Sequence, residues 1–222
     1  PEEIENVVIP FLNEHKHVIK DLYFTCRIPP FETDAMGGLI FREERDTVIN
    51  NALVISHVTG IPLSATFNNT KVSPSYDNYL KFVEHFRDIY NEGVRNITIP
   101  HTSWLRFGLK KEFPDLFVKN TIINRVNTAS EVAVLFEEGF DYINLDRKLM
   151  RDEDALKEIT KAKKAMEKKL DKKLYISLLW NEGCEGTCPI QNEHFQYNFN
   201  RTETENAYFE TKMADISPCI IK

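Results

Sequence analysis

Short apolar runs alternate along the chain with longer stretches in which apolar residues recur at helical spacing. Strands are predicted for six of these runs, at Asp21–Cys26, Pro62–Phe67, Asn96–Pro100, Phe117–Ile123, Tyr142–Leu145 and Leu174–Leu179. The later runs lack strict polar–apolar alternation, which is typical of strands covered on both faces. The pattern therefore predicts parallel strands connected by helices.

The stretches between the strands carry signals for the starts and ends of helices. Apolar residues from Tyr76 to Asn91 follow helical spacing, and Ser73 followed by Pro74 is typical of a helix start. Thr128–Glu131 has the sequence of a capping box. We expect Gly139 to end the helix that follows in the left-handed conformation.

A faint internal repeat favours a barrel over an open sheet. Glu92–Ile99 resembles Glu138–Leu145: in each, a helix ends on glycine and a strand follows after a short turn. The sequence has no Gly-x-Gly-x-x-Gly turn of the kind that dinucleotide-binding sheets use. We therefore predict a (β/α) TIM-type barrel, with a doubly wound sheet as the alternative.

A complete barrel of this type has eight strands, and this chain offers fewer. After Leu179 a seventh strand is conceivable only at Met213–Ile221. We therefore expect residues 1–222 to form one barrel domain that is incomplete at its C-terminal end, with six to seven strands present. A partner protein that completes the barrel would be one way to close it.

Composition and charge narrow the range of partners. The chain has 222 residues, of which 42% are hydrophobic, and a formal net charge of -6. That charge gives no global attraction to nucleic acid or anionic membranes. No apolar run is long enough to span a bilayer, and the N-terminus lacks a signal-peptide core, so we expect a cytoplasmic protein. The lysines of the helix predicted at Glu153–Lys169 alternate with acids, so a solvated face is favoured over nucleic-acid binding.

Polar side chains follow the predicted strands, where barrel enzymes place their active sites. His101, Arg125, Arg147 and Glu182 are the candidate catalytic residues. Histidine is the usual general acid or base, and arginine can clamp a carboxylate or phosphate through two hydrogen bonds. The alternatives are a histidine bonded to backbone and arginines ion-paired with Asp146 or Glu182.

The sharpest local signal is a pair of cysteines, Cys184 and Cys188, in a glycine-containing loop that ends at Pro189. This spacing lets both thiolates face one metal ion or cluster, and His194 could be a further ligand, which suits zinc. Barrel closure could bring Cys26 and Cys219 to the same loop, and four thiolates are what a [4Fe–4S] cluster takes. Free thiols in a loop are the alternative.

The segment Asn181–Pro189 resembles the collagenase-like peptidase family of unknown catalytic type, peptidase family U thirty-two. Phe136–Leu149 resembles that family's helix–glycine–strand–arginine passage more loosely, although the family often has Arg-Glu where this chain has Arg147 and Lys148.

The resemblance implies a complete or incomplete barrel. Several members of the family are iron–sulfur proteins of oxygen-independent hydroxylation. Carried over to this chain, Cys184 and Cys188 match the paired cluster ligands, Cys26 an early ligand and Cys219 a late one.

These observations give one leading hypothesis and three alternatives. The leading one is an iron–sulfur barrel protein that takes part in an oxygen-independent hydroxylation or a related redox step on a small-molecule or modified-base substrate. The alternatives are a zinc-binding barrel protein, a cysteine-type peptidase, and a non-catalytic subunit that needs a partner.

Overall fold

The computed structural model describes residues 2–32 and 42–179. Within them one sheet contains six parallel strands: β1 (Leu22–Thr25), β2 (Leu63–Thr66), β3 (Asn96–Ile99), β4 (Phe117–Asn120), β5 (Tyr142–Asn144) and β6 (Tyr175–Ser177). Their order in the sheet is the order in the sequence, and each pairs with the next in parallel. A doubly wound sheet reverses direction part-way, so the consecutive order identifies a partial TIM-type barrel.

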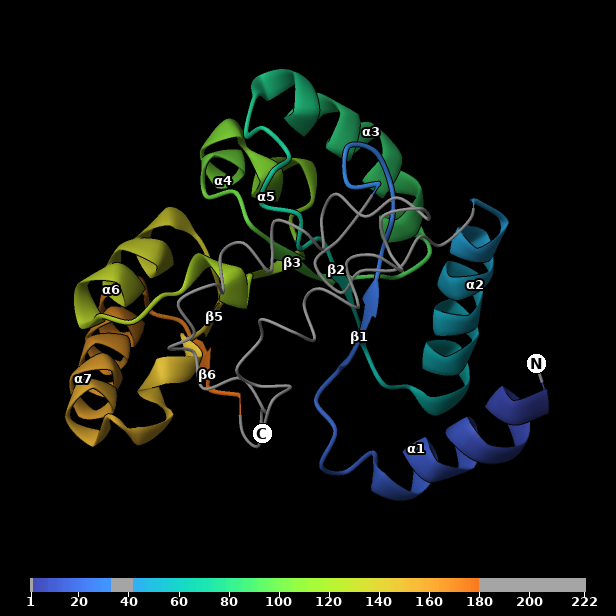
Figure 1. The fold of residues 1–222 in the computed structure, drawn as a ribbon, viewed down its shortest axis with the longest axis horizontal. Coiled ribbons are helices and arrows are strands. Elements are labelled where there is room, and N and C mark those ends of the chain that lie inside the picture. The colour runs from blue at the N-terminus through green and yellow to red at the C-terminus, as the bar shows by residue number, and fades with distance from the viewer. Residues whose placement is uncertain (1, 33–41, 180–222) are drawn as a thin grey trace, which may run out of the picture.

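Helices occupy the outer side of the arc of strands (Figure 1). They are α1 (Ile9–His15), α2 (Arg42–Thr59), α3 (Tyr76–Asn91), α4 (Ser103–Phe107), α5 (Leu109–Glu112), α6 (Ala129–Glu138) and α7 (Glu153–Leu170). Shorter turns are η1 (Ile4–Val8), which precedes α1, η2 (Ile122–Asn124), which follows β4, and η3 (Arg147–Arg151), which follows β5. No helix in the described ranges is long and apolar enough to cross a membrane.

All six strands predicted from the sequence are confirmed, with ends that differ from the predicted ones by up to three residues. β4 ends at Asn120 rather than Ile123, because the Thr121 side chain accepts a hydrogen bond from the Ile123 amide and starts η2. The predicted helix start at Ser73 and Pro74 is wrong by two residues. Ser75 is extended and accepts from the Asn78 amide, which makes it the N-cap of α3.

The predicted capping box and glycine stop of α6 are both confirmed. The Thr128 side chain accepts from the Glu131 amide, and Glu131 accepts from the Thr128 amide. Gly139 follows with a φ of 111°, a conformation that a side chain would strain. The predicted seventh strand at Met213–Ile221 lies outside the described residues.

The sheet's outer face builds the hydrophobic core. Ala65, Ile97 and Val118 stand in register on neighbouring strands and are fully buried beneath the helices. Aromatic side chains from the helices and loops fill the space above them, chiefly Phe31, Phe67, Phe82, Phe86, Phe113 and Trp104. Burial of this face supplies the main driving force for the fold.

The inner face of the same sheet is polar. Because side chains alternate along a strand, the residues next to that apolar row point the other way. They form one register row across the sheet: Thr25, Thr66, Thr98, Lys119, Tyr142 and Tyr175. Branched apolar residues usually fill the inside of a TIM barrel, so this face is not built as a dry core.

The start of β1 reaches across the inner face to the far strands. The Lys119 ammonium of β4 forms an ion pair with Asp21, a residue 98 positions earlier in the chain. Lys20 Nζ lies 3.2 Å from the ring centre of Tyr175 on β6 and 5.1 Å from that of Tyr142 on β5. These contacts require the sheet to curve, as a barrel does.

Candidate functional site

The carboxyl ends of the parallel strands bring most of the described candidate residues to one edge of the sheet. His101 follows β3, Arg125 follows β4 and Arg147 follows β5. The Asn124 side chain donates to the Pro100 carbonyl over 3.1 Å and so ties the end of β4 to that of β3. Glu182, the fourth predicted catalytic residue, lies outside the described residues.

His101 is buried in an aromatic environment, with only 7% of the residue exposed. Its ring stacks on Phe31 at a centroid distance of 6.0 Å and lies 5.0 Å from that of Trp104. Burial lowers the pKa of His101 to about 4, although a hydrogen bond to the Val72 backbone opposes the shift. His101 is therefore neutral at pH 7.

The hydrogen bonds of His101 leave one ring nitrogen unused. Its Nε2 is buried and has no hydrogen-bond partner among the described residues. Nδ1 is thus the nitrogen that bonds to the Val72 backbone, and it donates there because that bond favours the protonated ring. A neutral imidazole with Nδ1 protonated presents Nε2 as an acceptor. The sequence analysis named a histidine bonded to backbone as the alternative to a catalytic role. The structure shows such a bond at Nδ1 but leaves Nε2 without a partner among the described residues.

Three more buried polar atoms of this region lack a partner in the described part of the chain. They are Asn68 Oδ1, which follows β2, and Ser103 Oγ and Trp104 Nε1 in the first turn of α4. Asn68 and His101 sit at the ends of adjacent, hydrogen-bonded strands. Native proteins leave few buried polar atoms unsatisfied, so four in one neighbourhood call for an explanation.

Arg125 forms the ion pair that the sequence offered as its alternative role. Its Nε donates to Asp146 Oδ2 over 3.2 Å, and the Asp146 side chain is 3% exposed. The other carboxylate oxygen accepts from the Lys148 amide. The Arg125 side chain remains 40% exposed, so part of its guanidinium faces solvent while the carboxylate fixes its direction.

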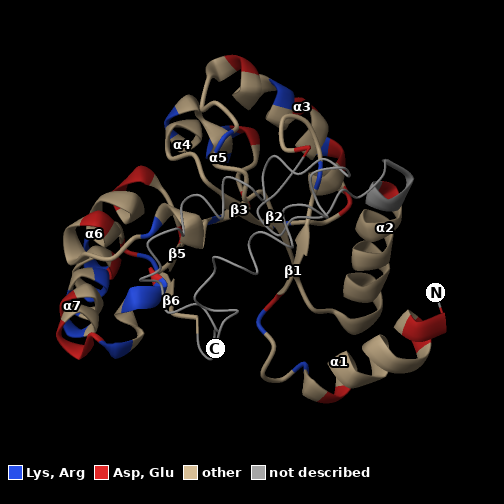
Figure 2. Cartoon of the chain, in the orientation of Figure 1, with Lys and Arg blue, Asp and Glu red and all other residues tan. Residues whose placement is uncertain are grey.

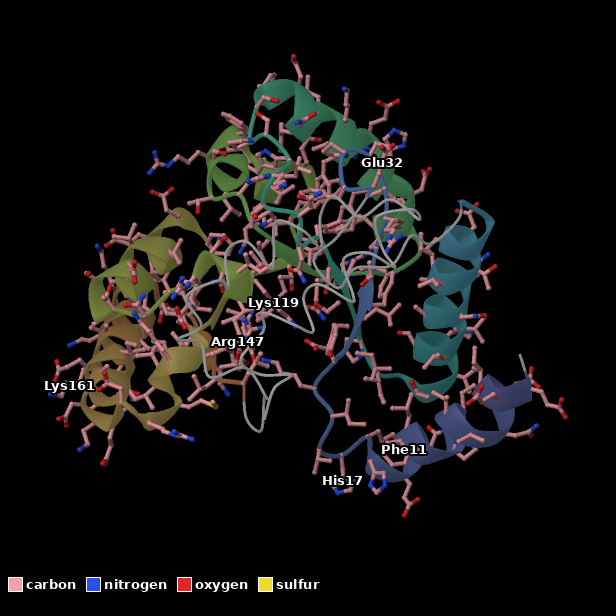
Figure 3. All side chains as sticks on the ribbon, in the orientation of Figure 1. Phe11, His17, Glu32, Lys119, Arg147 and Lys161 are labelled. Atoms are coloured by element: carbon pink, nitrogen blue, oxygen red, sulfur yellow. The ribbon has the colours of Figure 1, made fainter. Side chains whose placement is uncertain are left out.

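Arg147 lies on the inner side of the arc of strands, as Lys119 does (Figure 3). Lys161, by contrast, points outward from α7 in the same view. Five lysines of α7 and of the turn after it form ion pairs with acidic side chains: Lys157, Lys161, Lys163, Lys169 and Lys172. Both signs of charge alternate along that helix (Figure 2), which is a solvated face.

The predicted metal ligands fall mostly outside the described residues: Cys184, Cys188, His194 and Cys219. Cys26 is described, follows β1 and is 1% exposed within the hydrophobic core. Such burial suits an unreactive thiol. No group of three or more metal-binding side chains exists in residues 2–32 and 42–179. The described residues therefore do not make up a cluster or zinc site by themselves.

Three residues of interest escaped the sequence analysis: Ser103, Trp104 and Lys119. Ser103 and Trp104 belong to a short helix with no marked pattern. Lys119 left one signal, a lysine inside a predicted strand, which indicates either an exposed edge or a charge that pairs with another group.

Comparison with known proteins bears on the fold. No family model matches the sequence, and no curated protein matches it. Among solved structures, the U32 peptidase Mk0906 superposes with a TM-score of 0.57 and 14% identity, over 84% of this chain and 78% of that one. This chain shares the fold of a U32 peptidase. The resemblance predicted from the sequence is therefore confirmed for the fold.

A protein from Roseobacter denitrificans that is described as a proposed racemase also matches, with a TM-score of 0.47 and 11% identity, over 84% of this chain and 47% of that one.

Proposed function

We propose that this protein is an enzyme that binds a small polar substrate at the carboxyl ends of β2 to β5. The observation that carries the proposal is the set of four buried, unpartnered polar atoms on Asn68, His101, Ser103 and Trp104. A buried polar group without a hydrogen bond costs about 1–3 kcal/mol. A substrate that bonds to these atoms offsets that cost.

The four atoms define what such a substrate must offer. His101 Nε2 and Asn68 Oδ1 accept hydrogen bonds, Trp104 Nε1 donates, and Ser103 Oγ does either. A ligand with an O–H or N–H group beside a carbonyl or hydroxyl oxygen matches this set. The low pKa of His101 makes it a weak base, so we assign it the task of orienting the substrate as an acceptor.

Arg125 supplies the charge at this edge. With Nε held by Asp146, the remaining guanidinium nitrogens can donate to a carboxylate or phosphate of the substrate. The Asp146 carboxylate holds the Arg125 guanidinium in place before the substrate arrives, which lowers the side-chain entropy that is lost on binding.

A ligand screen tests this proposal. Small metabolites are scanned for a rise in Tm, and hits are titrated by the tryptophan fluorescence of a Trp180→Phe background, which leaves Trp104, whose ring centre is 5.0 Å from that of His101, as the reporter. We expect His101→Leu to weaken the affinity for these ligands by roughly tenfold, which corresponds to the loss of one buried hydrogen bond. His85→Leu, on the exposed face of α3, is the matched control. Hits that bind His101→Leu as well as the wild type would exclude this site.

An iron–sulfur redox role is the second candidate, and the position of Cys26 favours it. Cys26 lies at the carboxyl end of β1, the end at which the chain also leaves β6 toward Cys184. A [4Fe–4S] cluster would supply one-electron transfer for a hydroxylation or related step. The burial of Cys26 in the core weighs against its use as a ligand.

Metal analysis separates the remaining possibilities. Protein purified without oxygen should contain iron and sulfide and be brown if the cluster hypothesis holds. One zinc per chain without sulfide favours the zinc-binding alternative. Colourless protein free of both metals contradicts the two. For the peptidase alternative, hydrolysis that survives Cys184→Ala rules out a nucleophilic role of that thiol.

A further inference from the structure

Three lysines from distant parts of the chain gather on the inner face of the sheet. Lys20 precedes β1, Lys119 lies on β4 and Lys173 precedes β6. The pKa of Lys20 is lowered, chiefly by partial burial of a residue that stays mostly exposed, and the positive charges of Lys119 and Lys173 add to the shift. The three side chains are therefore electrostatic neighbours although they come from distant parts of the sequence.

Two of these lysines make cation–π contacts with the same aromatic ring. Lys20 Nζ lies 3.2 Å and Lys173 Nζ 5.4 Å from the ring centre of Tyr175. Phe117 and Tyr142 complete the aromatic group around Lys20, at 5.3 Å and 5.1 Å. Cation–π contacts stabilise each ammonium, but they do not remove the repulsion between like charges that share a ring.

The carboxylates nearby do not balance this charge. Within the described part of the chain, the charged groups that act on Lys20 are the two lysines and one carboxylate, Asp21. Asp21 already pairs with Lys119. Lys173 also acts on Glu167, whose carboxylate binds Lys163 and the Leu174 amide. The lysine cluster of Lys20, Lys119 and Lys173 thus keeps an excess of positive charge.

Two hydroxyl-bearing residues lie on the same face of the sheet as the cluster. Thr98 is the register neighbour of Lys119, and Ser64 stands one row nearer the amino end, between β1 and β3. Ser64 is fully buried, and its Oγ has no hydrogen-bond partner among the described residues. The Ser64 hydroxyl is therefore a buried donor left unused on the same face of the sheet.

We propose that the lysine cluster binds a small anion, the phosphate or carboxylate group of a metabolite. The exposed Lys20 and Lys173 admit it, and the buried Lys119 anchors it. Thr98, the register neighbour of Lys119, stands three residues before His101, or about 10 Å along the strand. The anion site is therefore separate from the substrate site at the carboxyl ends, and it does not depend on that proposal.

Binding at this place would connect the segments before the first and the last of the described strands. The anion would contact the segment before β1, the middle of β4 and the segment before β6. Because it bridges parts of the chain that separate on unfolding, it should stabilise the folded state by mass action.

Calorimetric titration and thermal unfolding of the full chain with inorganic phosphate and with malonate test this inference. At roughly 100 times its Kd, either anion should raise Tm by about 5 °C, against chloride at equal ionic strength. Preference for phosphate identifies a phosphoryl group, and preference for malonate a carboxylate. A response to both anions no larger than that to chloride overturns the proposal.

Paired variants locate the site. Lys20→Met with Lys173→Met should weaken anion binding by roughly tenfold, since two charge-assisted contacts are lost. Lys157→Met with Lys161→Met removes the same charge from the exposed face of α7 and should leave Kd unchanged. Asp21→Asn should tighten binding, because it removes the competing carboxylate. Equal losses in both double variants would point to non-specific attraction and overturn the proposal.

Discussion

The two faces of one sheet differ in what they do for this protein. The outer face, with Ala65, Ile97 and Val118, is apolar, fully buried and covered by helices. The inner face, with Thr66, Thr98 and Lys119 on the same strands, carries hydroxyl groups and charge. The strands therefore owe their stability to one side and leave the other free for polar contacts.

Truncation on the outer face should cause the largest effect. Ile97→Ala creates a cavity beneath the helices at a site that is 0% exposed, so we expect a loss of about 4 kcal/mol in the free energy of unfolding. Urea denaturation measures it. A loss below about 1 kcal/mol would mean that this face is not the core.

Removal of the buried charge should be the most damaging change on the inner face. Lys119→Met leaves the Asp21 carboxylate without its partner, and both side chains are largely buried, at 9% and 16% exposed. We expect a loss of about 3 kcal/mol. The double variant with Asp21→Asn should recover most of that loss. If it is as unstable as the single variant, the ion pair is not the reason for the effect.

His101 should make stability depend on pH at the carboxyl ends of the strands. Its folded pKa of about 4 lies below its ordinary value of 6.5, so the unfolded chain takes up the proton first as pH falls. Stability should drop by about 2 kcal/mol between pH 7 and pH 5 because of this residue. His101→Leu should remove that part of the slope in urea titrations at several pH values, while His85→Leu should keep it.

A matched exchange of hydroxyl and methyl groups gives the smallest and sharpest test of the two faces. Val118→Thr buries a hydroxyl in the core and should cost about 2 kcal/mol. Thr98→Val, on the inner face, removes a hydroxyl from a polar environment and should cost less than Val118→Thr, about 1 kcal/mol. Equal costs for the two variants, measured by thermal unfolding, would show that the faces are not different environments.

The sequence by itself determined the elements and their order. The apolar runs, the Thr128–Glu131 capping box and Gly139 are local signals, because hydrogen bonds within a few residues decide them. Alternation of strand and helix then implies parallel pairing, and the barrel follows from consecutive strand order. Even the candidate positions of His101 and Arg125 needed only the rule that barrel sites lie at strand ends.

Only the tertiary structure decided how those residues are used. The burial that lowers the pKa of His101 comes from Phe31 and Trp104, which belong to other segments of the chain. The pairing of Lys119 with Asp21, 98 residues apart, depends on the register of four strands and on the curvature of the sheet. Such contacts follow from accumulated geometry rather than from local pattern, and for that reason the lysine cluster was visible only in the folded chain.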